Sequence, residues 1–352
     1  MNTDSGEQNI SIAISWMRFP LIFMIVLLHC YCSIDARFHP LYFKLVYPFG
    51  LWLGETGVPA FFFISGFLFF YSKKTYKKKI LSRVPSLLVP YIFWNTLIII
   101  IYVLLDRLGH PMTIVGKNIS DFGLWDYIRA FIDRGDWNHG NGVPMLCPFW
   151  YIRNLMVICL VSPLLYYILK YLKWFFILVL LGWWITIPYN GMIASSFLFY
   201  CMGALFSIQQ INPLTIVQNR KIVLFTVWIF FFVIDWAGHS LWFFPYKLII
   251  HRLSLVFNIF VLLVVGNYLG GKQSHVWTTM NKSSFWVYAV HYPLIIVIEK
   301  TTTHILRNLN DWQLLLFYFL CVIGVTTICV FSYIGFSKLC PQFMSIITGN
   351  RT

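Results

Sequence analysis

Charged side chains are scarce in this sequence. Asp, Glu, Lys and Arg make up 11% of its 352 residues, whereas apolar residues make up 59% and the mean hydropathy is +0.73. A chain of this composition has too little polar surface to be solvated by water as a globule. The pattern of a membrane β-barrel, alternating polar and apolar residues, is also missing, because runs such as 97–105 and 175–187 are apolar on every side. A lipid-embedded helical protein is therefore expected.

Several functional signatures are absent as well. The eight cysteines include no CxxC pair, which argues against a zinc or redox centre, so no metal site is expected. No GxSxG sequence indicates a serine nucleophile. The first ten residues contain no Lys or Arg, and no small-residue cleavage site follows the first apolar run. The first helix is therefore expected to remain in the membrane.

Apolar runs of about 20 residues, enough to cross a bilayer core about 30 Å thick, recur along the whole chain. They predict an all-α fold, a polytopic transmembrane helical bundle of about ten spans, in a single domain that covers residues 1–352. An even number of spans places both termini on one side of the membrane. The expected spans are approximately 11–33, 49–71, 85–106, 148–168, 173–189, 193–208, 221–238, 246–269, 284–299 and 312–337.

The positions of Lys and Arg predict the orientation, since positively charged loops stay in the cytoplasm. The densest group lies between the second and third spans and consists of Lys73, Lys74, Lys77, Lys78, Lys79 and Arg83. Both termini are therefore expected in the cytoplasm, as in a multi-pass protein of a bacterial cytoplasmic (inner) membrane. The net charge of +14 fits this topology and contact with anionic lipids. It does not indicate nucleic-acid binding, because the cations form no single stripe.

Ionisable groups inside spans are the best candidates for chemistry, since a charge near mid-bilayer costs at least about 2.5 kcal/mol. Arg18 and His29 lie on one predicted helix, eleven residues apart, which is about 16.5 Å of rise and three turns plus about 20°. Both side chains should thus share a face, with Arg18 near the cytoplasm and His29 near the outer side. Alternatively, Arg18 snorkels to the inner interface and His29 bonds a neighbouring helix.

Further ionisable groups fall at the depth of His29, and this common depth predicts a polar vestibule open to the outer side. They are Glu55, Arg153, His251 and Arg252; Asp235 and His291 are two more buried groups. The outer loop before residue 147 contains residues 120–133, whose apolar spacing predicts an amphipathic helix on the membrane surface or over a substrate entrance.

Five sequence segments, in order along the chain, resemble one known family. Arg18 to His29 fits an Arg-x10-His motif on the first helix; the other four are residues 57–68 (GVPAFFFISGFL), 83–91 (RVPSLLVPY), 149–155 (FWYIRNL) and 284–293 (SFWVYAVHYP). Together they resemble the acyltransferase-3 family of bacterial membrane O-acyltransferases over residues 10–340.

The resemblance implies an enzyme that transfers an acyl group, most often acetyl, from cytoplasmic acyl-CoA to a hydroxyl of an extracytoplasmic glycan or lipid-linked sugar. Acetyl-CoA is then a donor substrate, and no permanently bound cofactor is expected. The other partners are the acceptor and the lipid bilayer, and a homo-oligomer is compatible with this reading. A succinyl donor, and transfer through an acyl-enzyme or a partner protein, stay open.

The hypothesis assigns His29 as general base or transient acyl carrier. Arg18 and Arg83 would hold the acyl-CoA phosphates, and Arg153 would stabilise the oxyanion or orient the acceptor. Glu55 would orient or charge-tune His29, with Trp150 and His291 as further supporting residues.

Two other classes of protein compete with the enzyme. A multi-span transporter or exporter would show an internal repeat with paired broken helices, and the two halves of the sequence show no convincing similarity. A structural protein of an envelope complex would not depend on acyl-CoA at all.

Overall fold

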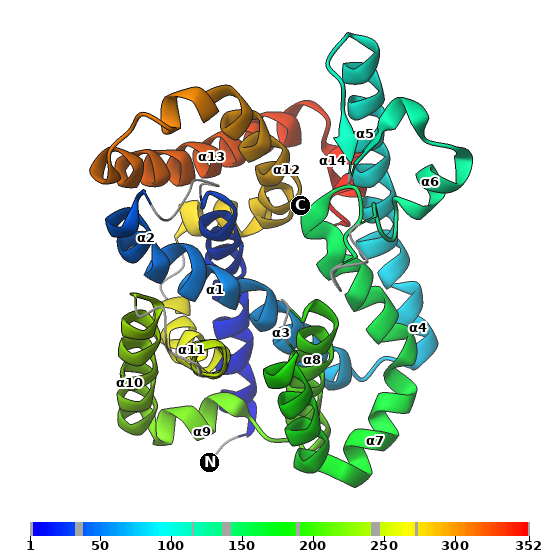
Figure 1. Ribbon diagram of the computed structural model, residues 1–352. Coiled ribbons are helices and arrows are strands. Elements are labelled where there is room, and N and C mark those ends of the chain that lie inside the picture. Colours follow the sequence, from blue (N-terminus) through cyan, green and yellow to red (C-terminus); the bar gives the residue numbers. More distant parts are fainter. Residues whose placement is uncertain are drawn as a thin grey trace. The chain divides into compact units, whose positions relative to one another are not determined.

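The protein is almost entirely helical in the parts of the chain that its computed structural model describes (Figure 1). These parts are residues 3–31, 38–114, 116–135, 142–187, 191–240, 247–271 and 274–350. Two compact units make up the chain. Unit 1 combines residues 1–71 and 199–334, and unit 2 combines residues 72–198 and 335–352.

Unit 1 is built around its first helix, α1 (Thr3–His29). Its other elements are α2 (Pro40–Tyr47), a π-helical segment η1 (Pro48–Leu53), a 3₁₀ turn η2 (Gly54–Thr56), α3 (Gly57–Tyr71), most of α8 (Met192–Ile208), α9 (Pro213–Asn219), α10 (Lys221–Ser240), α11 (Lys247–Gly270), α12 (His275–Leu306) and most of α13 (Asp311–Leu339).

Two helices flank α1 in opposite directions. Helix α12 runs parallel to it, since Trp16 stacks on Trp277 at one end and His29 meets His291 at the other. Helix α11 runs antiparallel, with Gly266 against Ala13. Helices α11 and α12 therefore both pack on α1, which forms the centre of unit 1.

Close packing in unit 1 depends on glycine. A Cβ atom on Gly66 of α3 would lie 2.0 Å from the carbonyl oxygen of Tyr200, and one on Gly203 of α8 would lie 1.9 Å from that of Phe63. The two helices thus touch backbone to backbone, as membrane helices with small interface residues do.

Unit 2 contains α4 (Tyr76–Leu81), a π-helical segment η3 (Val84–Leu88), α5 (Val89–Arg107), η4 (Ile119–Asp121), α6 (Leu124–Arg129), η6 (Cys147–Phe149), α7 (Trp150–Thr186) and α14 (Pro341–Ile347). A two-stranded antiparallel ribbon, β1 (Thr113–Ile114) and β2 (Lys117–Asn118), pairs Thr113 with Asn118. The Trp94 indole N–H donates to the Ile347 carbonyl at 3.0 Å, which fastens α14 to α5.

The helix expected over residues 120–133 is much shorter in the structure. The extended backbone of Gly123 separates the turn η4 from the six-residue helix α6. Apolar spacing on both sides of this glycine had suggested one continuous helix. Within α6, Leu124 and Trp125 are largely exposed.

The predicted count of ten spans is not confirmed. By length and apolar composition, seven described helices could cross a membrane, or up to eight if α8 and α9, which meet at a bend of 90°, count as one. The spans expected at 148–168 and 173–189 form a single element, α7, kinked at Lys173. The span expected at 284–299 lies in α12, which is absent from these seven because it carries many polar residues.

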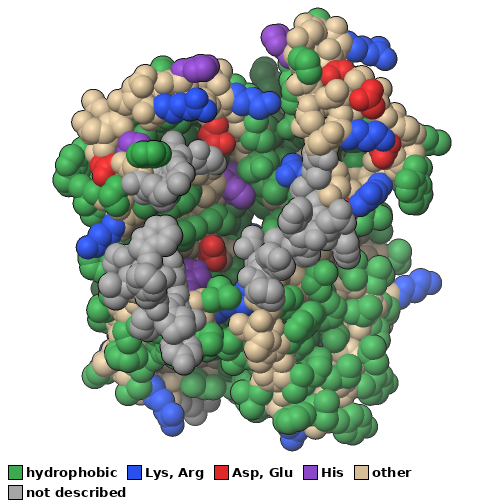
Figure 2. All heavy atoms as spheres, viewed as in Figure 1, with side chains coloured by type: hydrophobic (Ala, Val, Ile, Leu, Met, Phe, Trp, Pro, Cys, Tyr) green, Lys and Arg blue, Asp and Glu red, His purple; other side chains and the backbone are tan. Residues whose placement is uncertain are grey.

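The surface agrees with a protein that lies in a membrane. Hydrophobic side chains occupy large areas of the face drawn in Figure 2, and charged side chains are few on it. The side of the membrane on which each terminus lies stays a prediction from the distribution of Lys and Arg.

Candidate active site

His29 is the last residue of α1, and it packs against α12. Its imidazole centroid lies 5.3 Å from that of His291 and 5.0 Å from the ring of Tyr292. The His29 side chain is half-buried. The structure therefore brings together two of the histidines that the sequence marked as candidates.

His291 is fully buried, and the structure defines its hydrogen bonding on one side. Its Nδ1 lies 3.0 Å from the Val287 carbonyl oxygen, one turn earlier in α12. A carbonyl only accepts hydrogen bonds, so Nδ1 carries the proton and donates. The buried Nε2 atom has no hydrogen-bond partner among the described residues. In the neutral ring it is a lone-pair acceptor beside His29.

Arg18 is exposed on α1. The residues around it face α12, because Trp16 and Phe19 pack on Trp277 and the Phe19 amide donates to Asn281 at 3.2 Å. Helix α12 therefore follows α1 from the region of Arg18 to His29. An exposed guanidinium here suits a phosphate ligand and a lipid head group equally well.

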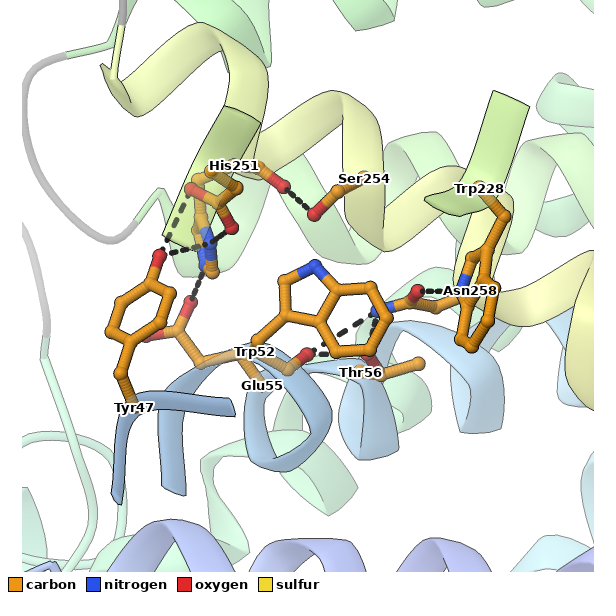
Figure 3. Close-up of polar contacts among 9 residues, drawn as sticks. Tyr47, Trp52, Glu55, Thr56, Trp228, His251, Ser254 and Asn258 are labelled. Carbon is orange, nitrogen blue, oxygen red and sulfur yellow. Dashed lines mark hydrogen bonds and ion pairs between the residues drawn. The ribbon is translucent and has the colours of Figure 1, made fainter. Parts of the chain in front are cut away.

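A second polar cluster of unit 1 centres on His251 of α11 (Figure 3). Its Nδ1 lies 2.8 Å from Oδ2 of Asp235 in α10, and its Nε2 lies 3.1 Å from Oε2 of Glu55 in η2. The Tyr47 hydroxyl donates to Oδ1 of Asp235 at 2.9 Å and lies 3.1 Å from His251 Nδ1. One histidine thus bridges two carboxylates from different helices.

The irregular helix between Tyr47 and Thr56 explains how two of these groups meet. Residues eight apart on a regular α-helix point about 80° away from each other. The π-helical segment η1 winds more slowly, because its amides bond carbonyls five residues back. The angle between the two side chains therefore differs from that of a regular helix, and Tyr47 and Glu55 both point toward His251 (Figure 3).

A polar side chain of α11 fixes the same irregular segment in place. The Asn258 amide donates to the Thr56 hydroxyl at 2.8 Å and to the Trp52 carbonyl at 3.3 Å, and it accepts from the Trp228 indole at 2.7 Å. These bonds satisfy backbone and side-chain groups that a π-helix leaves poorly paired. The position of Glu55 therefore depends on α10 and α11.

The two clusters of unit 1 adjoin each other through a close approach of backbones. A Cβ on Gly54 would lie 2.9 Å from Cβ and 3.0 Å from Cα of Leu28. Leu28 precedes His29 and Gly54 precedes Glu55, so each of these two residues is one position from the contact. Glycine is needed here because any side chain would push η2 away from α1.

The candidates Arg83, Trp150 and Arg153 belong to unit 2. Arg83 is half-buried at the start of η3, and Trp150 is half-buried at the first position of α7. The guanidinium of Arg153 donates through Nη1 to the Ile132 and Gly142 carbonyls. In the described contacts it thus fastens the end of the loop that precedes α7 to the start of that helix.

Arg153 also continues into a polar chain. Its Nε and Nη2 atoms donate to the Asn154 side-chain oxygen at 3.0 and 2.9 Å, and the Asn154 amide donates to the Ser196 hydroxyl at 3.0 Å. The role of Arg153 in stabilising an oxyanion stays a prediction.

The sequence predicted part of this arrangement. The common depth of Glu55 and His251 indicated that they lie together, and they do. Glu55 was expected to orient His29, whereas its described hydrogen bond is to His251. Tyr47 and Asn258 were not found, because neither carries a charge that stands out in an apolar run.

Comparisons of the sequence with known proteins identify one family. The chain is 24% identical over 376 residues to "Succinoglycan biosynthesis protein ExoH" of Rhizobium meliloti (strain 1021), in an alignment that covers 98% of this chain and 94% of the relative. No solved structure gives a significant match. The family model described as "Acyltransferase domain" matches residues 11–334, which include the helices that carry both clusters of unit 1. With that match, the chain belongs to the acyltransferase-3 family of membrane acyltransferases.

Proposed function

We propose that the protein transfers an acyl group, in the first instance acetyl, from cytoplasmic acyl-CoA to a hydroxyl of an extracytoplasmic glycan or lipid-linked sugar. The observation that carries this proposal is the pair His29 and His291. A half-buried imidazole at the end of α1 packs on a fully buried imidazole with one bonded and one available nitrogen.

The pair suits acyl transfer because it offers a base and a group that orients it. A small rotation of the His29 ring would let its single N–H group donate to Nε2 of His291. The other His29 nitrogen would then hold its lone pair toward the acceptor, which is the tautomer that a general base needs.

The reaction then balances without a metal or a redox step. The acceptor hydroxyl gives its proton to His29 while its oxygen attacks the thioester carbonyl carbon. The carbon–sulfur bond breaks, and the CoA thiolate takes the proton back from the imidazolium. The products are an O-acyl ester and free CoA, and the alternative in which His29 carries the acyl group for a moment gives the same products.

Arg18 and Arg83 are our candidates for binding the CoA phosphates. Arg18 is exposed and lies about three turns from His29 along α1, and Arg83 is the last member of the basic group that starts at Lys73. A glycan acceptor is supported by the name of the relative, which assigns that protein to succinoglycan biosynthesis. A bacterial cytoplasmic (inner) membrane is the setting that gives both substrates access.

The test uses purified protein in proteoliposomes with isotopically labelled acetyl-CoA and a membrane glycan extract from cells that lack the gene. His29→Ala should lower transfer about 10²- to 10⁴-fold, the range for loss of a general base. Arg18→Ala should raise the KM for acetyl-CoA. The matched controls are His304→Ala and Arg307→Ala, which alter exposed residues near the end of α12.

Normal transfer by folded His29→Ala protein would contradict the proposed chemistry. Failure of folded wild-type protein to bind acetyl-CoA or another acyl-CoA would contradict the proposed donor and favour a transporter.

A further inference from the structure

Glu55 forms the exposed end of a buried chain of ionisable groups. Its side chain is 41% exposed, whereas those of His251 and Asp235 are 11% and 0% exposed. The described hydrogen bond to His251 uses only Oε2 of the Glu55 carboxylate. The other oxygen points away from that bond and is able to accept further hydrogen bonds.

The hydrogen bonds and charges of this chain hold the Glu55 carboxylate in place. Both nitrogens of His251 face carboxylate oxygens, and an ionised carboxylate only accepts, so both nitrogens carry hydrogen. The resulting imidazolium lies between two negative charges. Tyr47 donates a further hydrogen bond to Asp235, the buried member. Such a fully bonded chain is rigid, because loss of any member leaves a buried charge without its partner.

The charges around Glu55 define what it would bind. Arg252 of α11 also interacts electrostatically with Glu55, so a cation lies near this carboxylate. An ionised carboxylate accepts hydrogen bonds from neutral hydroxyl groups and repels phosphate. This chemistry matches adjacent hydroxyls of a sugar ring.

We propose that Glu55 binds hydroxyl groups of the acceptor sugar beside His29, and that His251 and Asp235 are positioning residues that hold its carboxylate. The proposal rests on the proposed acyl transfer. Glu55 and His29 each lie one residue from the backbone contact between Gly54 and Leu28, and we place one acceptor sugar across the two side chains. An acceptor held through a neighbouring hydroxyl presents the reacting hydroxyl in a fixed orientation, which lowers the entropic part of the barrier.

The test measures acceptor and donor dependence separately in proteoliposomes. The acceptor is the glycan extract from gene-deleted cells, titrated at saturating acetyl-CoA, and donor binding is measured as the rise in Tm with acetyl-CoA. Glu55→Gln should raise the apparent KM for the extract at least tenfold and leave the acetyl-CoA shift unchanged. Glu55→Asp, which keeps the charge, should recover part of the loss. The matched control Glu299→Gln, in α12, should behave as wild type.

The positioning role has its own readout. Asp235→Asn keeps the shape of the buried group but removes its charge, so it should raise the same acceptor KM without changing donor binding. The inference would be overturned if Glu55→Gln left the acceptor KM unchanged while His29→Ala lost transfer as expected. The proposed acyl transfer would not be affected by that result. Equal loss of donor binding in Glu55→Gln would also overturn the inference. Transfer that does not depend on His29 would instead contradict the proposed function.

Discussion

The cluster around Arg153 in unit 2 and the cluster around His251 in unit 1 both place charge among apolar helices, but they end differently. Arg153 donates to backbone carbonyls and to Asn154, which continues to the Ser196 hydroxyl. The His251 chain ends at Glu55, whose carboxylate is partly exposed.

The difference suggests how to separate structural from chemical charges in a membrane protein. The described bonds of Arg153 satisfy loop carbonyl groups that would otherwise lack a hydrogen-bond donor, and this stabilises the fold. A series of hydrogen-bonded groups that is fully bonded at its buried end and exposed at the other offers a hydrogen-bond acceptor atom to a ligand. Burial of a charge alone does not distinguish the two cases.

The largest expected effect is at His291, which packs on His29 in unit 1. His291→Phe keeps an aromatic ring, of somewhat larger volume, but removes both nitrogens, so His29 loses its orienting partner. Acyl transfer should fall about 10²-fold, while the Tm should change little because the site remains apolar and filled. Labelled acetyl transfer and thermal unfolding measure the two effects. Wild-type transfer by this variant would show that His291 only fills space.

The structural side of the comparison predicts the opposite pattern at Arg153. Arg153→Ala removes donors from two carbonyls and from Asn154, which should lower the free energy of unfolding by about 2 kcal/mol. A purely structural role predicts transfer per folded molecule near the wild-type value, whereas the oxyanion role expected from the sequence predicts a large loss. Thermal unfolding and an activity assay normalised to folded protein check this. A large loss of activity with normal stability would support the oxyanion role expected from the sequence.

The smallest expected effect concerns an exposed pair in the loop between α5 and α7. Lys117 Nζ lies 2.5 Å from Asp126 Oδ2, and the Gly123 amide donates to the same oxygen at 2.9 Å. These bonds lower the pKa of Asp126 below its ordinary value, with the Lys117 bond as the largest cause. Its stabilising effect is therefore present above the ordinary carboxyl pKa and is lost as pH falls through the lowered one.

Hydrogen exchange at the Gly123 amide measures this loss. Protection should decrease at acidic pH in the wild type and be pH-independent, apart from the intrinsic exchange rate, in Asp126→Asn. High salt should reduce the protection at neutral pH, because exposed pairs are screened. Protection that rises as pH falls would show that the ionised Asp126 carboxylate is not what protects the Gly123 amide.

The fold class followed from composition, because apolar runs without charge can only be solvated by lipid or by one another. The spacing of Arg18 and His29 on one helix also followed from the sequence, since helical geometry relates positions eleven apart. The number of spans did not, because length and hydropathy cannot tell two helices joined at the Lys173 kink from one.

The sequence by itself determined that this is a helical membrane protein of the acyltransferase-3 family and which buried charges it carries. Only the tertiary structure decided which of those charges meet. Tyr47 and Glu55 share a face because a π-helical segment changes the winding between them, and Glu55 bonds His251 because α10 and α11 hold it there. Such pairings join residues about 200 positions apart, where local periodicity carries no information.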